Sequence, residues 1–128
     1  MMHPSNFKYT EQHEWALIEG DIATIGITDY AQKELGDVVF VELPAPGTKV
    51  SCMKPFGVIE AVKTVSDIFS PLTGEVLETN EKLKASPQLI NESPNKDAWM
   101  IKIKIANPAE LGKLLPVEKY LELTGEKE

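Results

Sequence analysis

Residues 56–76 read FGVIEAVKTVSDIFSPLTGEV, and this stretch decides the fold. Two apolar, β-rich runs, 56–62 and 67–70, flank a short segment that contains Lys63. Such runs on either side of a short turn are typical of a β-hairpin whose strands are partly buried. Lys63 is then expected near the hairpin tip, with its amine directed away from the buried base. A proline and a glycine bend the chain after the second strand.

The sequence on both sides of this hairpin is also rich in strand signals. Residues 15–18 and 22–27 are expected to form a hairpin around Gly20. Residues 99–105 alternate apolar residues with lysines, as in a half-buried strand. Short strands separated by turns, at a spacing of roughly 8–12 residues, predict a mostly β domain. The further strands are expected at residues 15–18, 22–27, 37–43, 75–78 and 99–105.

Short helices are expected at the periphery of this domain. The first begins at Thr28 or Asp29, either of which can cap it, and ends at Gly36, a residue that suits a helix C-terminus. An asparagine precedes each of the next two helices and can cap it in the same way. Residues 89–97 are polar and rich in turn formers, so an irregular segment is expected there. The helices are expected at residues 30–35, 81–85, 109–115 and 117–123.

Composition limits the classes of function. The chain has 128 residues, 42% of them hydrophobic, which suits one domain over residues 1–128. Its formal net charge is −7, and its 13 basic residues are all lysines. Arginine is the usual bidentate ligand of phosphate groups, so an acidic chain without it is a poor candidate for binding nucleic acid.

Cysteine, histidine and hydropathy patterns exclude further classes. One cysteine permits no intrachain disulfide, which fits a reducing compartment. His3 and His13 have no cluster of further ligands beside them, so no metal site is expected. No apolar run is long enough to span a membrane, and no signal or transit peptide is recognisable. We therefore expect a cytoplasmic protein without a membrane partner.

Common catalytic motifs are also missing from the sequence. There is no glycine-rich phosphate loop and no nucleophile elbow, and no spacing of carboxylates singles out an acid/base pair. Lys63 is the residue with an unusual context. A lysine in a turn is most often a solvated charge, and only the flanking pattern argues for more.

Several blocks of the chain resemble the glycine cleavage system H protein family. Around Lys63, residues 57–76 follow the family pattern G-x-V/I-E-S-V-K-x-x-S-D/E-x-x-S-P-x-S/T-G-E-V, with Ala61 in place of the usual serine. Because separate blocks agree in the same order, the resemblance covers almost the whole chain. The other matching blocks are residues 9–15, 26–32, 35–37, 89–91, 93–94 and 99–102.

The resemblance implies a cofactor carrier and not an enzyme. In this family lipoic acid is joined by an amide to the lysine that matches Lys63. The implied fold is a flattened β-sandwich or barrel-sandwich hybrid of the lipoyl and biotinyl carrier type, with short peripheral helices. The carrier core would span about 15–105, and residues 1–14 and 106–128 would be family-specific additions.

The family's reaction cycle also implies partners. A glycine decarboxylase (P protein) loads an aminomethyl group onto the lipoyl arm, and an aminomethyltransferase (T protein) takes it up. A dihydrolipoamide dehydrogenase (L protein) reoxidises the dithiol, and lipoate-attaching enzymes install the cofactor. A tether keeps the cofactor at an effective concentration on the order of millimolar. The loaded arm is expected to fold back into a cleft that excludes water.

The resemblance suggests roles for four acidic or polar residues. Glu14 and Asp67 are cleft candidates, since a carboxylate would hold the cationic amine of the loaded arm. Glu60 and Ser66 are candidates for recognition by the lipoylating enzymes. Each of them can also be an ordinary solvated or hydrogen-bonded group. Some family members carry a histidine where this chain has Glu34, which argues against a general base on that helix.

Two other carrier functions stay open at this point. An H-like lipoate donor or redox carrier outside glycine cleavage would have the same sequence around Lys63. A biotin carrier is a weaker alternative, because biotinylated lysines usually lie between two methionines, and Lys63 lies between Val62 and Thr64. A structural β scaffold without a cofactor would carry no covalent modification.

Overall fold

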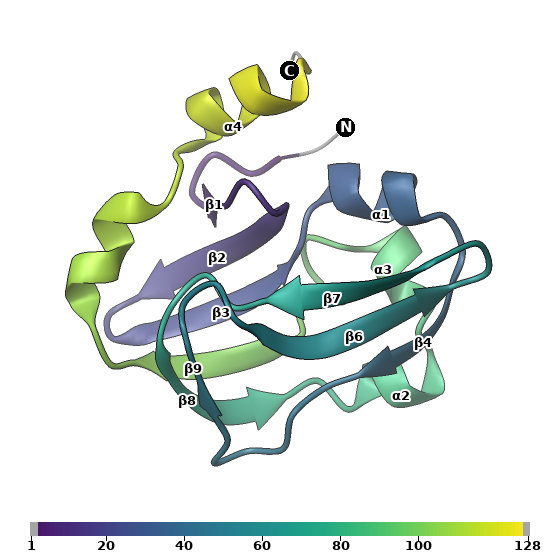
Figure 1. Cartoon of the computed structure of the whole chain (residues 1–128), viewed down its shortest axis with the longest axis horizontal. Coiled ribbons are helices and arrows are strands. Elements are labelled where there is room, and N and C mark those ends of the chain that lie inside the picture. Colours follow the sequence, from purple (N-terminus) through teal and green to yellow (C-terminus); the bar gives the residue numbers. More distant parts are fainter. Residues whose placement is uncertain (1–2, 127–128) are drawn as a thin grey trace.

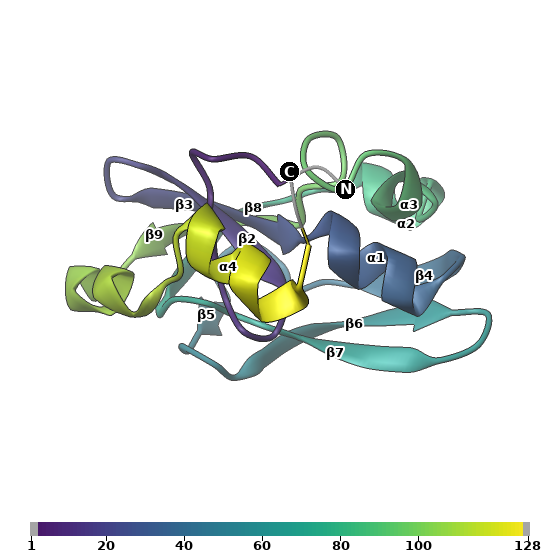
Figure 2. The same ribbon diagram turned by 90° about the horizontal axis from the view of Figure 1, so that it is seen from above.

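The computed structural model describes residues 3–126, which form two antiparallel sheets packed face to face (Figure 1, Figure 2). The larger sheet has the order β1-β2-β3-β9-β8-β5, and the smaller has the order β4-β6-β7. The strands are β1 (Lys8–Tyr9), β2 (Glu14–Glu19), β3 (Ile22–Ile27), β4 (Val38–Glu42), β5 (Lys49–Val50), β6 (Pro55–Ala61), β7 (Val65–Phe69), β8 (Gly74–Thr79) and β9 (Ile101–Ile105).

The strands expected from the sequence are all present. β2 and β3 form the first hairpin, with Trp15 opposite Gly26. β6 and β7 form the second hairpin, in which Glu60 lies opposite Val65. The alternation in β9 is also confirmed, since its isoleucines are buried and Lys104 is exposed. The mostly β, flattened sandwich expected from the sequence is therefore confirmed.

Short helices lie at the periphery, as expected, but two details of that expectation were wrong. Residues 89–97 are not wholly irregular, because they include a one-turn helix whose Ile90 is fully buried. Burial of this side chain outweighs the polar local pattern. The expected helix at 109–115 is instead a short 3₁₀ helix, capped by the Asn107 side chain. The helices are α1 (Asp29–Leu35), α2 (Lys82–Ala85), α3 (Leu89–Glu92), η1 (Pro108–Lys113) and α4 (Val117–Thr124).

Helix α1 is fixed at both ends, and this fixes one wall of the site described below. The Thr28 hydroxyl accepts a hydrogen bond from the Ala31 N–H, so Thr28 is the N-cap, while Asp29 bonds to the Gln32 side chain. Gly36 ends the helix with φ = 78°, in the left-handed region that suits glycine.

Most of the apolar core lies between the two sheets. A separate aromatic cluster covers the outer side of β2, where α4 and the N-terminal segment pack together (Figure 1). The aromatic cluster consists of Phe7, Tyr9, Trp15, Val117 and Tyr120. It joins the two ends of the described chain to the sandwich.

Two kinds of feature are absent from residues 3–126. No helix in this range is both long and apolar enough to cross a membrane. No group of three or more His, Cys, Asp or Glu side chains in the same range is arranged to hold a metal ion.

Candidate functional site

The tip of the β6–β7 hairpin projects at one end of the molecule, beside the end of α1 (Figure 1, Figure 2). Backbone hydrogen bonds hold this turn: the Ala61 N–H donates to the Thr64 carbonyl at 2.8 Å, and the Val62 N–H donates to the Asp37 carbonyl at 2.9 Å. Lys63 is exposed on it. The turn is therefore tied to the loop after α1, while the Lys63 side chain is open to solvent.

Large apolar side chains are exposed around the same tip. Val62 is 76% exposed, and Phe40 is 49% exposed. The strand register places Phe40, Glu60 and Val65 in one row across β4, β6 and β7, on the outer face of the smaller sheet. We call the exposed apolar residues Val39, Phe40, Val62 and Val65 the hairpin patch.

A cleft of about 350 Å³ lies between α1, the start of β2 and β7. Its walls combine apolar side chains with a few polar groups, as is typical of small-molecule sites. The lining residues are Gln12, His13, Glu14, Ile27, Tyr30, Ala31, Glu34, Leu35, Ile59, Ser66, Asp67 and Ile68.

Glu14 is the buried acid of this cleft and is only 2% exposed. Its carboxylate accepts a hydrogen bond of 2.6 Å from the Thr10 hydroxyl and one of 3.4 Å from the Phe69 N–H. Burial raises the pKa of Glu14 to about 7 and outweighs the hydrogen bonds, which favour the charged form. A cation in the cleft would favour the ionised carboxylate and would be held by it.

The other candidates from the sequence lie in two different places. Asp67 and Ser66 border the cleft with Glu14, although Asp67 is exposed, while Ser66 is half-buried and its hydroxyl donates to the Asp67 carbonyl at 3.2 Å. Glu60 is exposed on the outer face of the smaller sheet, in the row described above. The fold therefore brings Glu14, Ser66 and Asp67 together and leaves Glu60 outside the cleft.

The sequence assigned no role in the site to three titratable residues of the cleft, His13, Tyr30 and Glu34. His13 has φ = 70°, and its ring lies 4.7 Å from that of Tyr30. Burial lowers the pKa of His13, and a hydrogen bond to Glu34 raises the pKa of Tyr30. The four-residue spacing of Tyr30 and Glu34 on one helix was an available signal. His13 gave no such signal, because its partners are distant in sequence.

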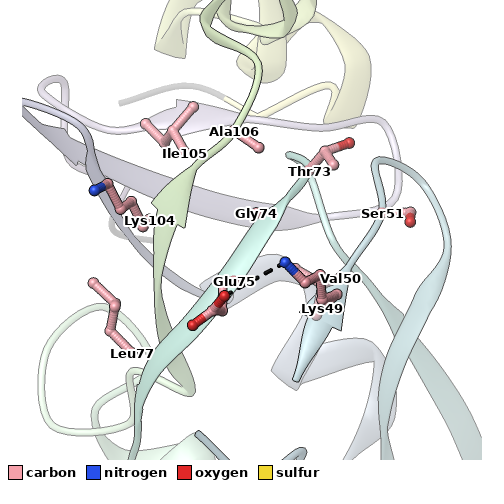
Figure 3. Close-up of a pocket in the computed structure, with 10 residues that line it drawn as sticks. All are labelled: Lys49, Val50, Ser51, Thr73, Gly74, Glu75, Leu77, Lys104, Ile105 and Ala106. Carbon is pink, nitrogen blue, oxygen red and sulfur yellow. Dashed lines mark ion pairs between the residues drawn. The ribbon is translucent and has the colours of Figure 1, made fainter. Parts of the chain in front are cut away.

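A larger cavity of about 530 Å³ lies elsewhere, on β5, β8 and β9 (Figure 3). Lys49 and Glu75 lie opposite each other on the neighbouring strands β5 and β8 and form an ion pair there, with 3.5 Å between Nζ and Oε1. Both side chains are exposed, and exposed ion pairs contribute little to the stability of the folded state. The cavity contains none of the site residues expected from the sequence, so we assign the functional site to the smaller cleft.

The flattened sandwich and its projecting hairpin place the chain in the class of lipoyl and biotinyl carrier domains. The family model described as glycine cleavage H-protein matches residues 7–127. Two curated glycine cleavage system H proteins, from two strains of Staphylococcus epidermidis, are 50% and 49% identical over 126 residues. Each match covers 98% of this chain and 100% of the relative.

A solved structure agrees with the sequence comparisons. The crystal structure of a glycine cleavage system H protein from Mycobacterium marinum matches with a TM-score of 0.89 and 34% identity. The match covers 97% of this chain and 100% of that chain. The chain belongs to the glycine cleavage H-protein family.

Family membership establishes the general function. The protein is the lipoyl carrier component of the glycine cleavage system and is not itself a catalyst. The family is known to carry lipoate, and membership implies that other components of the system are its partners. The carrier role in glycine cleavage that the sequence predicted is thereby confirmed.

Proposed function

We propose that Lys63 carries the lipoyl group, as an amide formed on its Nζ. The observation that carries this proposal is an exposed primary amine on a turn that backbone hydrogen bonds hold in place. Lysine supplies such an amine, and arginine does not. The rigid hairpin would fix the point from which the arm starts, while the lysine and lipoyl chain beyond it would stay flexible.

The surroundings of Lys63 fit such an arm. The Lys63 side chain passes along the end of α1, since its Cε lies 3.4 Å from the position that a Cβ at Gly36 would take. The cleft begins at the same helix, since Glu34 and Leu35 line it. The lysine and the cleft thus share one edge of the molecule, and a flexible arm could reach from one to the other.

The cleft is proposed to shelter the loaded arm. When bound, the lipoyl group supplies the dithiol that carries the aminomethyl cargo. Glu14 at the buried end and Asp67 at the rim would hold the cationic amine of that cargo. The apolar walls, which include Ile27, Ile59 and Ile68, would exclude water.

The proposed partners act at different points of the arm. Glycine decarboxylase, the aminomethyltransferase and dihydrolipoamide dehydrogenase need to reach only its dithiol end. A lipoate-attaching enzyme must bring its active site to Lys63 Nζ and so must cover the hairpin tip. The proposed recognition surface for that enzyme is therefore the hairpin patch with Glu60 on the outer face, together with Ser66 on the cleft side of the same hairpin. The cytoplasmic location expected from the sequence stays a prediction.

We treat the whole of residues 1–128 as one carrier domain, with a core of about 15–105. Two contacts support an integral role for the flanking segments. β1 pairs with β2 in the larger sheet, and Tyr9 forms an isolated bridge with Leu115. The additions are therefore joined to each other as well as to the core.

Intact mass spectrometry of protein produced together with a lipoate-attaching enzyme tests the proposal. We expect one lipoyl increment on the wild type and on Lys33→Arg, in which an exposed lysine of α1 is changed as a control. Lys63→Arg keeps the charge but is expected to stay unmodified, and to lose all exchange of the glycine carboxyl with bicarbonate in the presence of P protein. A lipoyl increment on Lys63→Arg, or wild-type protein that is never modified, would refute the assignment.

A further inference from the structure

The C-terminal helix reaches the cleft through the hydroxyl of one tyrosine. Tyr120 of α4 is fully buried. Its hydroxyl oxygen lies 2.7 Å from His13 Nδ1 and 2.7 Å from Thr28 Oγ1. These partners are 107 and 92 positions away in sequence. One hydroxyl therefore connects the end of the chain to two segments near its beginning.

The two partners of Tyr120 connect it to two different walls of the cleft: His13 lines one wall, and Thr28 caps the helix that forms another. His13 directly precedes Glu14, the buried acid. Thr28 caps α1, the helix that carries Tyr30 and Glu34 into the cleft. The Thr28 N–H also donates to the His13 carbonyl at 3.0 Å, so the two walls meet beside Tyr120.

The backbone of His13 is held in an unfavourable conformation. Its φ of 70° lies in the left-handed region, which residues other than glycine rarely adopt. Such a conformation persists only where the surroundings determine it. The Tyr120 hydroxyl and the Tyr30 ring both contact the His13 side chain. Because Glu14 is the next residue in the chain, a change in the backbone conformation of His13 would redirect the Glu14 carboxylate.

The ring of Tyr120 is fixed by contacts that do not involve its hydroxyl. It stacks on the Tyr9 ring, with 4.7 Å between centroids and 12° between planes. The His3 ring packs edge-on against it at 5.1 Å. These ring contacts set the position of the hydroxyl, and a phenylalanine at this place would keep them.

We propose that Tyr120 is a positioning residue of the cleft, whose hydroxyl holds the His13–Glu14 segment against the start of α1. The C-terminal helix is then part of the functional site and not only a cover of the sandwich. The inference rests on the proposed function in one respect, because it takes the cleft as the shelter of the loaded arm.

The matched pair Tyr120→Phe and Tyr9→Phe tests this role. Both tyrosines are fully buried in the aromatic cluster. The Tyr9 hydroxyl donates to the Pro4 carbonyl at 2.6 Å, and neither of these residues lines the cleft. Each variant loses one phenolic hydroxyl, so a general loss of stability should affect both alike. Only Tyr120→Phe should alter the cleft.

Two measurements use the full-length, unlipoylated protein. We expect the ¹⁵N resonance of His13 Nδ1 to shift in Tyr120→Phe and to stay unchanged in Tyr9→Phe. We also expect faster hydrogen exchange of the Thr28 amide in Tyr120→Phe, by roughly three- to tenfold, the range expected for the loss of one hydrogen bond. An unchanged His13 resonance together with unchanged Thr28 exchange would overturn the proposal, whatever the state of Lys63.

A third measurement uses lipoylated protein that has been loaded with glycine by P protein and then separated from it. Release of ammonia from the loaded arm should be severalfold faster in Tyr120→Phe than in the wild type and Tyr9→Phe. Equal release from all three proteins would overturn the positioning role even if His13 moves. Failure of the proposed function would look different, because mass spectrometry would then find no lipoyl group on Lys63 in any of them.

Discussion

The hairpin tip and the aromatic cluster each lie next to residues that line the cleft, but they differ in how their side chains are exposed. At the tip, Lys63 is exposed and Val62 is 76% exposed, so a change there disturbs little packing. In the aromatic cluster, Trp15 and Tyr120 are almost completely buried, and their contacts join distant parts of the chain. The proposed chemistry at the tip depends on accessibility, whereas the shape of the cleft depends on burial. The two regions should therefore respond to mutation in opposite ways.

The largest expected effect on stability comes from Gly26→Ala, beneath the aromatic cluster. A Cβ at Gly26 would lie 2.6 Å from Trp15 Cζ2, which is too close for a real contact. The indole cannot easily move, because it stacks on Phe7 and donates from Nε1 to the Pro94 carbonyl at 3.0 Å. We expect urea unfolding to show a loss of roughly 3 kcal/mol, as overpacked cores do.

Gly112→Ala is the control for that change. No atom lies within 4 Å of the position that a Cβ at Gly112 would take. Its free energy of unfolding should stay within about 0.5 kcal/mol of the wild type. Equal stability of the two variants would show that the aromatic cluster adapts more easily than its packing indicates, and would remove the contrast with the tip.

A second prediction concerns Glu14 and the pH dependence of stability. The pKa of Glu14 is raised from 4.5 to about 7 in the folded protein, so the folded state binds this proton more tightly than the unfolded chain. The resulting stabilisation is complete below pH 4.5 and is lost as the pH rises through 7. Between about pH 4 and about pH 8, the wild type should lose roughly 3 kcal/mol relative to Glu14→Gln.

Urea titrations of both proteins across this pH range measure that difference. Glu11→Gln is the control, because Glu11 is exposed and close in sequence. It should follow the pH dependence of the wild type. If Glu14→Gln also follows the wild type, then Glu14 ionises normally, and the cleft is wetter than its burial indicates.

The sequence predicted the tip better than the cleft, and the reason is physical. The hairpin and Lys63 lie in one contiguous stretch, where local patterning and turn residues determine the structure. The one-turn helix α3 escaped prediction because its stability comes from the burial of Ile90. The contacts of His13 with Tyr120 and Thr28 join segments that no local pattern connects. Glu14 was proposed through a family resemblance, and its burial needed the fold.

Val62→Ser should have the smallest effect on stability but a clear effect on the rate of lipoylation. Val62 is next to Lys63 and is highly exposed, so its replacement should change the free energy of unfolding by less than about 0.5 kcal/mol. If the hairpin patch is covered by the lipoate-attaching enzyme, the variant should be lipoylated roughly tenfold more slowly, which corresponds to about 1.4 kcal/mol.

Leu77→Ser is the control, because Leu77 is 41% exposed on β8, beside the larger cavity (Figure 3). Its rate of lipoylation, followed by intact mass spectrometry over time, should equal that of the wild type. Equal rates for both variants would mean that the enzyme recognises the turn backbone and Lys63 without using the apolar side chains. A slower rate for Leu77→Ser alone would move the recognition surface to the other sheet.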